Sequence, residues 1–182
     1  MAKAVFLDRD GTINFDPGYL NSPDELRIFS NAAEALKILK DHNYLLLVVT
    51  NQSGIGRGFM ELKDVHFIHQ RMNKILEHQA HVQIDEFLVC PHHPQEGCEC
   101  RKPNIKLIED AFKNFNIDPK QSFLIGDKIT DLQAGRNAGL KGNVLVRTGA
   151  GKKTETDLEP GSADFVANDI LEGVHWIIGQ TG

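Results

Sequence analysis

The sequence predicts an α/β protein with a central parallel sheet and helices on both of its faces, in a Rossmann-like arrangement. Short runs of branched apolar residues recur along the chain, and segments with apolar residues at helical spacing separate them. Most of the runs are continuously apolar rather than alternating, as expected for strands that are covered on both faces. Strands and helices that alternate in this way are typical of a parallel sheet with helical connections.

The predicted elements follow one another in a regular order. Strands are predicted over residues 4–8, 44–50, 85–90, 122–126, 143–147 and 164–167. Ser30 and Asn31 are good capping residues for a first helix. Further helices are predicted over residues 62–76, 105–115, 129–138 and 169–179. Residues 148–162 are rich in Gly, Lys and Thr and are predicted to form a loop.

Length and charge restrict the function. The 182 residues suit a single domain, residues 1–182, without an internal repeat or linker. A net charge of −5 argues against non-specific binding to nucleic acid, although a local basic cluster can still bind an anionic substrate. The longest apolar run, Tyr44 to Val49, is too short to cross a membrane, and no signal-like apolar region follows the N-terminus. We therefore expect a cytoplasmic monomer that binds neither nucleic acid nor membrane.

Polar residues gather where the predicted strands end. The letters DRDG close the first strand, TNQSG the second, a cysteine cluster the third, GDK the fourth and Arg147 the fifth. Ligands of open parallel sheets bind outside the carboxyl ends of the strands. Five separate segments are thus expected to supply polar groups to one edge of the sheet.

Three aspartates in this set suggest a metal. Asp8 and Asp10 flank one residue at the end of an apolar strand, and Asp127 follows another strand. Carboxylates this close repel one another unless a cation lies between them. A site with oxygen ligands alone favours Mg²⁺. The alternative is that Asp8 and Asp127 merely cap the helices that follow their strands.

All three cysteines of the chain lie in one short segment, VCPHHPQEGCECRKP. Cys90, His92, Cys98 and Cys100 supply three thiolates and one imidazole, a complete tetrahedral set for a structural Zn²⁺ with no position left for water. Cys98 and Cys100 lack the two-residue spacing of a redox motif. The alternative to a zinc site is that the cysteines cluster by accident. Zinc would order this loop, and two cations follow its last ligand directly.

Four segments resemble the motifs of the haloacid dehalogenase (HAD) superfamily of phosphatases. FLDRDGTIN is similar to the first motif and VVTNQSG to the second. Lys102 in CRKP fits the third, and LIGDKITD fits the fourth. The motifs occur in the correct order and span residues 4 to 131. The resemblance therefore implies a HAD fold, and no segment of this chain is large enough to form a separate cap domain.

The resemblance assigns roles to these residues. It implies that Asp8 attacks phosphorus to form an aspartyl-phosphate, and that Asp10 first protonates the leaving oxygen and later activates water. Thr50 and Lys102 would steady the phosphoryl oxygens. Mg²⁺ would be bound by Asp8, Asp10 and Asp127, with Asp10 contributing its main-chain carbonyl.

The zinc loop resembles one branch of this superfamily, which contains phosphatases of sugar bisphosphates and of histidinol phosphate. TNQSGIGRG and NFDPGY favour the sugar-bisphosphate enzymes, so a small sugar bisphosphate is the expected substrate. By this resemblance, the substrate-binding residues are Asp16, Pro17, Gly18, Tyr19, Asn51, Gln52, Ser53, Arg57, Arg101 and Lys128.

Three other functions stay open from the sequence. They are a histidinol-phosphate phosphatase, a polynucleotide 3′-phosphatase, and a non-catalytic interaction module stabilised by zinc. The acidic charge and the absence of a phosphate-binding P-loop oppose the second, and the four motif residues oppose the third. Outside the motifs, His66, His69, His78 and His81 lie on or near one predicted helix and are expected to form an exposed face, the alternative being that His66 and His69 pair.

Overall fold

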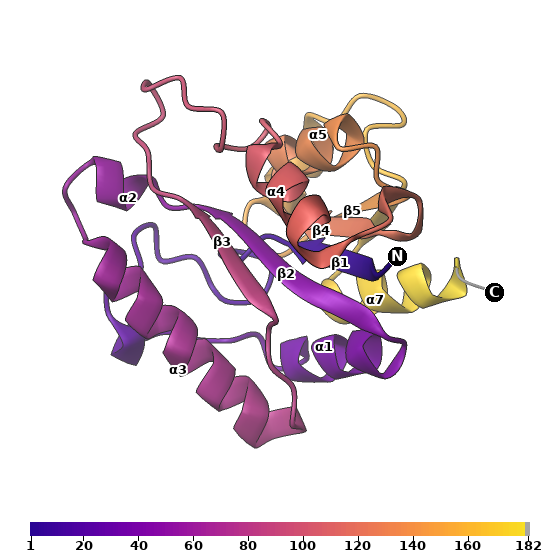
Figure 1. Ribbon diagram of the computed structural model, residues 1–182, viewed down its shortest axis with the longest axis horizontal. Helices are drawn as coiled ribbons and strands as arrows, with labels where there is room; N and C mark the ends of the chain where they lie inside the picture. The colour runs from indigo at the N-terminus through magenta and orange to yellow at the C-terminus, as the bar shows by residue number, and fades with distance from the viewer. Residues whose placement is uncertain (181–182) are drawn as a thin grey trace.

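A six-stranded parallel sheet forms the centre of the computed structural model, which describes residues 1–180 (Figure 1). The order of the strands across the sheet is β3-β2-β1-β4-β5-β6, and every neighbouring pair is parallel. Their bounds are β1 Lys3–Leu7, β2 Tyr44–Asn51, β3 Glu86–Cys90, β4 Phe123–Gly126, β5 Gly142–Val146 and β6 Phe165–Ala167. All six predicted strands are confirmed, and each of their ends lies within one residue of its predicted place.

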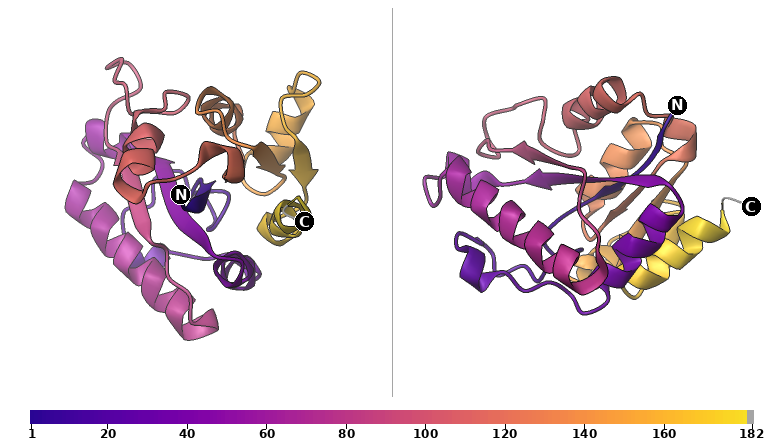
Figure 2. Two further views of the ribbon diagram at one scale, coloured as in Figure 1. Left: turned by 45° about the vertical axis from the view of Figure 1, so that its right-hand side comes forward. Right: turned by 60° about the horizontal axis from the view of Figure 1, so that its bottom comes forward.

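Helices cover both faces of the sheet, as Figures 1 and 2 show. On one face lie α1 (Ala32–Asp41), α3 (Leu62–Ala80) and α7 (Ile170–Gly179), and on the other lie α4 (Lys106–Phe115) and α5 (Ile129–Asn137). Val5 and Leu7 of β1 pack in the first core, and Ala4 and Phe6 pack in the second. Because successive side chains of a strand point to opposite faces, a continuously apolar strand serves both cores.

The strand order creates a crevice next to β1. The chain moves from β1 through β2 to β3 on one side, then returns to β4 on the other side and continues to β5 and β6. Connections that leave neighbouring strands in opposite directions open a crevice at the carboxyl ends of those strands. Asp8 directly follows β1 and Asp127 directly follows β4, so both lie at this point.

Two short α-helices were not expected from the sequence. The predicted loop over residues 148–162 contains α6 (Gly151–Thr156), and α2 (Ser53–Gly56) follows β2. The α6 segment, GKKTET, has no apolar stripe, so periodicity does not reveal it. Its order comes from polar contacts, because Thr154 Oγ1 donates to the main-chain oxygen of Asp127 at 2.8 Å and Glu155 pairs with Arg147.

The two longest connections around the crevice consist mainly of loops. The connection from β1 to α1 contains only the 3-10 helix Pro23–Glu25 and isolated bridges, and the connection from β3 to α4 contains the cysteine cluster. Within residues 1–180, neither connection builds a second sheet or helical layer, which agrees with the expected lack of a cap domain. A search of the described helices finds none that combines the length and the apolar character needed to span a membrane.

Candidate active site

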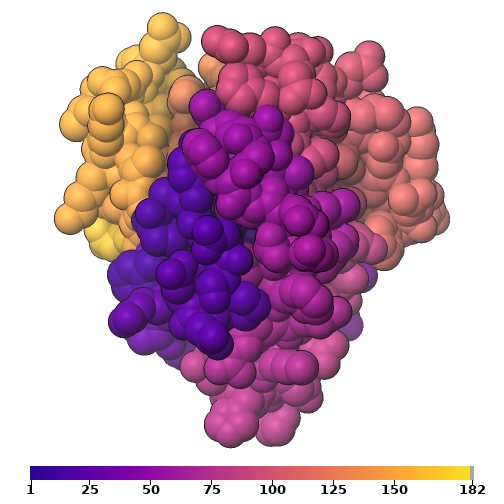
Figure 3. Space-filling view, turned by 90° about the vertical axis from the view of Figure 1, so that its left-hand side faces the viewer, coloured from indigo at the N-terminus to yellow at the C-terminus, as the bar shows by residue number. Residues whose placement is uncertain are grey.

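A cavity of about 610 Å³ opens at the carboxyl edge of the sheet, where the loop after β1, the segment after β2, the loop after β3 and the start of α5 meet. Figure 3 looks onto the side of the molecule where the indigo N-terminal segment lies between the magenta and the orange parts of the chain. The residues that line the cavity are Asp8, Asp10, Asp16, Gly18, Tyr19, Thr50, Asn51, Gln52, Ser53, Gly54, Arg101, Lys102, Lys128, Ile129, Thr130, Asp131 and Thr154.

Three buried carboxylates lie close together beside this cavity. Asp8, Asp127 and Asp131 each offer an oxygen within 4.8 Å of the others, and their exposed fractions are 6%, 0% and 1%. Asp8 and Asp127 were predicted from the strand ends. Asp131 was not predicted, although it lies in the fourth motif, because an acidic residue in the first turn of a helix is an ordinary cap. Asp131 also acts as a cap, since its Oδ2 accepts the main-chain N–H of Lys128 at 3.0 Å.

Lys102 lies between two of these carboxylates. Its Nζ is 2.7 Å from Asp8 Oδ1 and 2.8 Å from Asp131 Oδ1, and the side chain is buried. Burial acts to lower the pKa of Lys102, but the two carboxylates outweigh it and raise the pKa, so the amine stays charged. Asn51 fixes the main chain of Lys102, because its amide donates to the Lys102 carbonyl at 3.2 Å and accepts the Lys102 N–H at 3.1 Å.

The carboxylates retain an excess of negative charge that suits a cation. Burial raises the pKa of Asp8 to about 7, with Lys102 opposing the rise. Burial also raises the pKa of Asp127. Asp127 Oδ2 accepts the N–H of Ala150 at 2.7 Å, but the buried Oδ1 has no hydrogen-bond partner and lies 3.8 Å from Lys128 Nζ. A buried acceptor without a donor, next to a second carboxylate, fits a hard cation with oxygen ligands.

Two glycines enclose Asp127. A Cβ atom on Gly149 would lie 2.3 Å from Asp127 Oδ2 and 2.5 Å from the Cα of Gly11, and a Cβ on Gly11 would lie 2.2 Å from the same oxygen. Both glycines have positive φ, +91° at Gly11 and +56° at Gly149, a region that side chains rarely adopt. The absence of side chains therefore lets the main chain close around the carboxylate.

The Asp10 carboxylate is held apart from the other three. Arg9 Nε and NH2 donate to it at 2.8–3.1 Å, Asn14 donates at 2.9 Å and Gln52 at 2.8 Å. The Gln52 amide also donates to Thr50 Oγ1 at 2.7 Å, which ties Asp10 to the end of β2. Burial alone would raise the pKa of Asp10, but these donors outweigh it and hold the pKa below its ordinary value. Asp10 is therefore ionised.

The prediction that the histidines of α3 form an exposed face is wrong for His69. His66, His78 and His81 are exposed, but His69 is only 4% exposed. Its position directly after Ile68 turns it toward the protein, where its Nε2 lies 3.1 Å from Arg9 NH1. A polar side chain can occupy a buried helix face when a partner satisfies it. The sequence did not reveal this partner, which comes from the loop after β1.

Eight of the ten predicted substrate-binding residues line the cavity. Pro17 and the exposed Arg57 are not among the lining residues of the described chain. Arg101 NH1 is buried without a hydrogen-bond partner, and Lys128 Nζ lies 3.7 Å from Asp16 Oδ2. Cations therefore face this space from two segments.

Arg147 does not join these cations. The sequence predicted that it would contribute to the same edge of the sheet. Its guanidinium instead pairs with Glu155, with two hydrogen bonds of 2.7 Å, and NH1 donates to Asn168 at 2.9 Å. Arg147 is absent from the described cavity lining, so four strand ends rather than five contribute.

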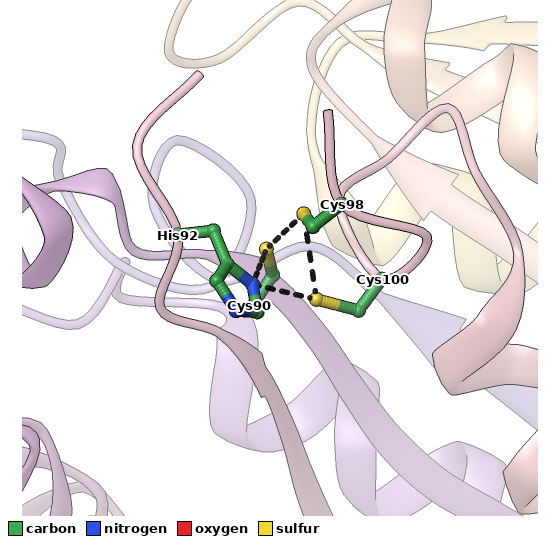
Figure 4. Close-up of side chains that lie close together, drawn as sticks. All are labelled: Cys90, His92, Cys98 and Cys100. Carbon is green, nitrogen blue, oxygen red and sulfur yellow. Dashed lines mark hydrogen bonds between the residues drawn. The ribbon is translucent and has the colours of Figure 1, made fainter. Parts of the chain in front are cut away.

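The cysteine cluster forms a compact donor set in the loop after β3 (Figure 4). Cys98 Sγ lies 3.6 Å from both Cys90 Sγ and Cys100 Sγ, and His92 Nδ1 lies 3.7 Å from Cys90 Sγ and 3.1 Å from Cys100 Sγ. A tetrahedral zinc with Zn–S bonds of about 2.3 Å and a Zn–N bond of about 2.0 Å separates its ligand atoms by about 3.5–3.8 Å. The four side chains therefore fit one tetrahedral metal ion.

Fold and site together define a class of protein. A doubly wound parallel sheet with carboxylates and a lysine at its switch point is the arrangement of HAD-like hydrolases, and residues 99–173 match the HAD-hydrolase-like family model. The chain is 41% identical to D-glycero-beta-D-manno-heptose-1,7-bisphosphate 7-phosphatase of Haemophilus ducreyi, over 96% of this chain and 98% of the relative. It is 44% identical to the Helicobacter pylori protein of the same name, over 79% and 83% of the two chains.

A solved structure agrees with these relatives. D,D-heptose 1,7-bisphosphate phosphatase from B. bronchiseptica, complexed with magnesium and phosphate, superposes with a TM-score of 0.91 at 31% identity and covers 98% of this chain and 99% of that one. The chain belongs to the family of D-glycero-D-manno-heptose-1,7-bisphosphate 7-phosphatases.

Proposed function

We propose that this protein is a Mg²⁺-dependent phosphatase that removes the 7-phosphate of D-glycero-D-manno-heptose 1,7-bisphosphate, a step of ADP-heptose biosynthesis in the cytoplasm. The observation that carries the proposal is the 41% identity to a curated relative of that name over 96% of the chain. The cavity supports it, because cations from separate segments surround a buried aspartate there. The similarity favours this substrate over histidinol phosphate, a polynucleotide 3′-phosphate or a non-catalytic role.

In the first step, an Asp8 carboxylate oxygen attacks the phosphorus of the 7-phosphate. The bond from Asp8 to phosphorus forms as the bond from phosphorus to the sugar oxygen breaks. Asp10 gives a proton to that leaving oxygen. Asp10 is ionised in the free protein, and it takes up this proton from solvent when the bound anionic phosphate raises the pKa of its carboxyl group.

In the second step, water attacks the phosphorus of the aspartyl-phosphate. Asp10, now a carboxylate again, accepts a proton from that water, and the bond between Asp8 and phosphorus breaks to release inorganic phosphate. Lys102 and Thr50 donate to the phosphoryl oxygens and stabilise the charge that develops on them. The position of Lys102 Nζ, 2.7 Å from Asp8 Oδ1, supports this role.

The residues present fit Mg²⁺. We assign as its ligands the carboxylates of Asp8 and Asp127, whose Oδ1 has no hydrogen-bond partner, and the main-chain carbonyl of Asp10. When bound, the ion neutralises negative charge shared by the phosphate and the aspartates. The Asp10 side chain is engaged by Arg9, Asn14 and Gln52, which leaves its carboxylate for proton transfer.

Residues in and next to the cavity recognise the sugar and its second phosphate. We assign substrate binding to Asp16, Pro17, Gly18, Tyr19, Asn51, Gln52, Ser53, Arg57, Arg101 and Lys128. Asn51 and Gln52 have a further task, because their amides hold Lys102 and Asp10 in place. The guanidinium of Arg101 suits a phosphate, since its planar fork can donate two parallel hydrogen bonds.

The cysteine cluster is assigned to a structural Zn²⁺ bound by Cys90, His92, Cys98 and Cys100. Zinc binding stabilises small zinc-dependent folds by roughly 10–16 kcal/mol, which suffices to order a loop of this length. Lys102 lies two residues after the last ligand, so an ordered loop also fixes the catalytic cation. Elemental analysis should find close to one zinc per chain, and activity lost on removal of Mg²⁺ alone should return when Mg²⁺ is added.

A phosphate-release assay tests the proposed reaction. The panel contains both anomers of the heptose 1,7-bisphosphate, histidinol phosphate and a 3′-phosphorylated oligonucleotide, each with Mg²⁺. We expect the bisphosphate to have the highest kcat/KM, and ³¹P NMR should show that the 1-phosphate is retained. A higher kcat/KM for histidinol phosphate, or loss of the 1-phosphate, would overturn the proposal.

The Arg101→Ala variant tests recognition of the distal phosphate. It should lower kcat/KM for the bisphosphate by about ten- to a hundredfold, the scale of a charge-assisted hydrogen bond, and should hardly affect a simple monophosphate. Arg71→Ala is the matched control, because Arg71 is exposed, lies outside the described cavity lining and has no assigned role. Equal losses on both substrates would show that Arg101 does not bind the distal phosphate.

A further inference from the structure

His69 occupies an unusual place for a histidine of a helix surface. It lies in α3, on the opposite side of Arg9 from the cavity residue Asp10. Its side chain is buried, and its ring stacks on Phe87 of β3 with a centroid distance of 4.0 Å and an interplanar angle of 12°. The ring therefore has a fixed plane, and its Nε2 is aimed at Arg9 NH1 at 3.1 Å.

The chemistry of the pair determines which atom carries the proton. Arginine has N–H donors and no acceptor, so the hydrogen bond requires His69 Nε2 to accept. The imidazole is then neutral, with its proton on Nδ1. Burial lowers the pKa of His69 to about 3, and the charges of Arg9 and His66 act in the same direction, whereas Asp10 opposes them. His69 is therefore an acceptor and not an acid in this site.

Arg9 connects this acceptor to the catalytic acid–base group. The Arg9 side chain is 0% exposed, and its Nε and NH2 bind both oxygens of Asp10 while NH1 binds His69. The guanidinium is planar and rigid, so a contact at NH1 also sets the direction of the Nε–NH2 edge. The orientation of Asp10 thus depends on a residue that touches neither Asp10 nor the cavity.

We propose that His69 is a positioning residue for proton transfer, which fixes the Arg9 guanidinium so that Asp10 is held in the correct orientation toward the leaving oxygen. This proposal rests on the acid–base role of Asp10 in the proposed function. If His69 acts in this way, replacing it slows the hydrolysis of substrates whose leaving group must be protonated more than that of substrates whose leaving group needs no proton. A purely structural role would slow all substrates alike.

Three variants separate these effects. His69→Phe preserves a ring to stack on Phe87 but removes the acceptor, and His69→Gln retains an acceptor oxygen. His66→Phe is the matched control, since His66 lies one turn earlier on α3 and is exposed. The substrates are the heptose bisphosphate, with a poor alkoxide leaving group, and p-nitrophenyl phosphate, whose leaving group needs no proton. The quantity compared is kcat/KM, which reports transfer to Asp8 and not the later hydrolysis.

His69→Phe should reduce kcat/KM by about tenfold for the sugar phosphate and by less than about twofold for the aryl phosphate. The tenfold loss is part of the roughly 10²–10⁴-fold acceleration that general acid catalysis supplies. His69→Gln should recover most of the lost rate, and His66→Phe should behave as the unmodified protein. Equal losses on both substrates, or no recovery with glutamine, would overturn the proposal.

A measurement on the unmodified protein covers the case in which His69→Phe does not fold. In ¹⁵N NMR, His69 should show an unprotonated Nε2 and a protonated Nδ1, with no titration between about pH 5 and 8. A protonated Nε2, or an ordinary titration, would refute the arrangement. Failure of the proposed function looks different, because the unmodified protein would then not hydrolyse the heptose bisphosphate. The comparison of leaving groups can be repeated with any alkyl phosphate that it does hydrolyse.

Discussion

Replacing Lys102 by methionine tests the charge balance of the buried carboxylates. Methionine has a similar length but no charge, so the substitution removes the ammonium group between Asp8 and Asp131. The two Nζ–oxygen distances are 2.7 and 2.8 Å, and Lys102, Asp8 and Asp131 are 3%, 6% and 1% exposed. Water therefore cannot replace the lost partner. Removing one member of a buried ion pair costs about 3–5 kcal/mol, and we expect a loss of that size in the free energy of unfolding near neutral pH.

Urea denaturation without added Mg²⁺ measures this loss. Burial raises the pKa of Asp8 in the folded state, and in the variant Lys102 no longer opposes that rise, so the folded state binds more protons than the unfolded state. Its stability then falls as the pH rises, and the deficit should be larger at pH 8 than at pH 5. The double variant Lys102→Met/Asp131→Asn should regain part of the stability, since one buried charge is gone, but none of the activity.

The reasoning fails if Lys102→Met lowers the free energy of unfolding by less than about 1 kcal/mol, the value typical of an exposed ion pair. It also fails if the deficit is the same at both pH values, because the carboxylates would then not be charged and unpaired. Recovery of activity in the double variant would show that Lys102 serves only to balance Asp131.

Three further predictions concern other parts of the site. Asp8→Asn should fold but retain less than about a hundredth of the activity in the phosphate-release assay, because an amide cannot attack phosphorus. Gly149→Ala should raise the Mg²⁺ concentration for half-maximal activity roughly tenfold or more, because alanine at positive φ costs about 1–2 kcal/mol and its Cβ would contact Asp127. The control is Gly161→Ala, where φ is also positive but the space is open, and this variant should not change that concentration. The folded pKa of His69, about 3, lies below its unfolded value, so its contribution is complete above pH 6.5 and is lost as the pH falls. Between pH 4 and 6, urea denaturation of His69→Gln should therefore show a pH slope shallower by about 1.4 kcal/mol per unit.

The four inner strands, β1, β2, β4 and β5, could be predicted from the sequence because they are buried on both faces, whereas the edge strands β3 and β6 are partly exposed. All six strands, the two edge strands included, are short runs of mainly apolar residues. The order of the strands could not be predicted from such runs, since pairing of β1 with both β2 and β4 is a property of the assembled sheet. The α6 segment was missed for a related reason, because tertiary polar contacts rather than an apolar stripe hold it.

Within the site, residues at strand ends were predictable and residues on helices were not. Asp8 and Asp127 stand beside apolar runs and Lys102 stands beside the cysteine cluster, and these neighbours give them a local context. Asp131 and His69 lie within helices, where the sequence offers an ordinary explanation, a cap for one and an exposed face for the other. Their importance arises from contacts with Lys102 and Arg9, which are distant in the chain.

Gly11 and Gly149 meet over Asp127, and this contact determines where the protein can change during evolution. Alanine scanning identifies catalytic groups by removing side chains. At these two positions alanine instead adds a Cβ atom, which would lie only 2.2–2.3 Å from Asp127 Oδ2. The main chain around Asp127, beside the cavity, is therefore closed to enlargement as well as to loss. The cavity wall formed by Asp16, Gly18 and Tyr19 is different, since these residues lie on an exposed loop. New substrate preferences in descendants of this sequence should arise in that loop, while the main chain around Asp127 stays the same.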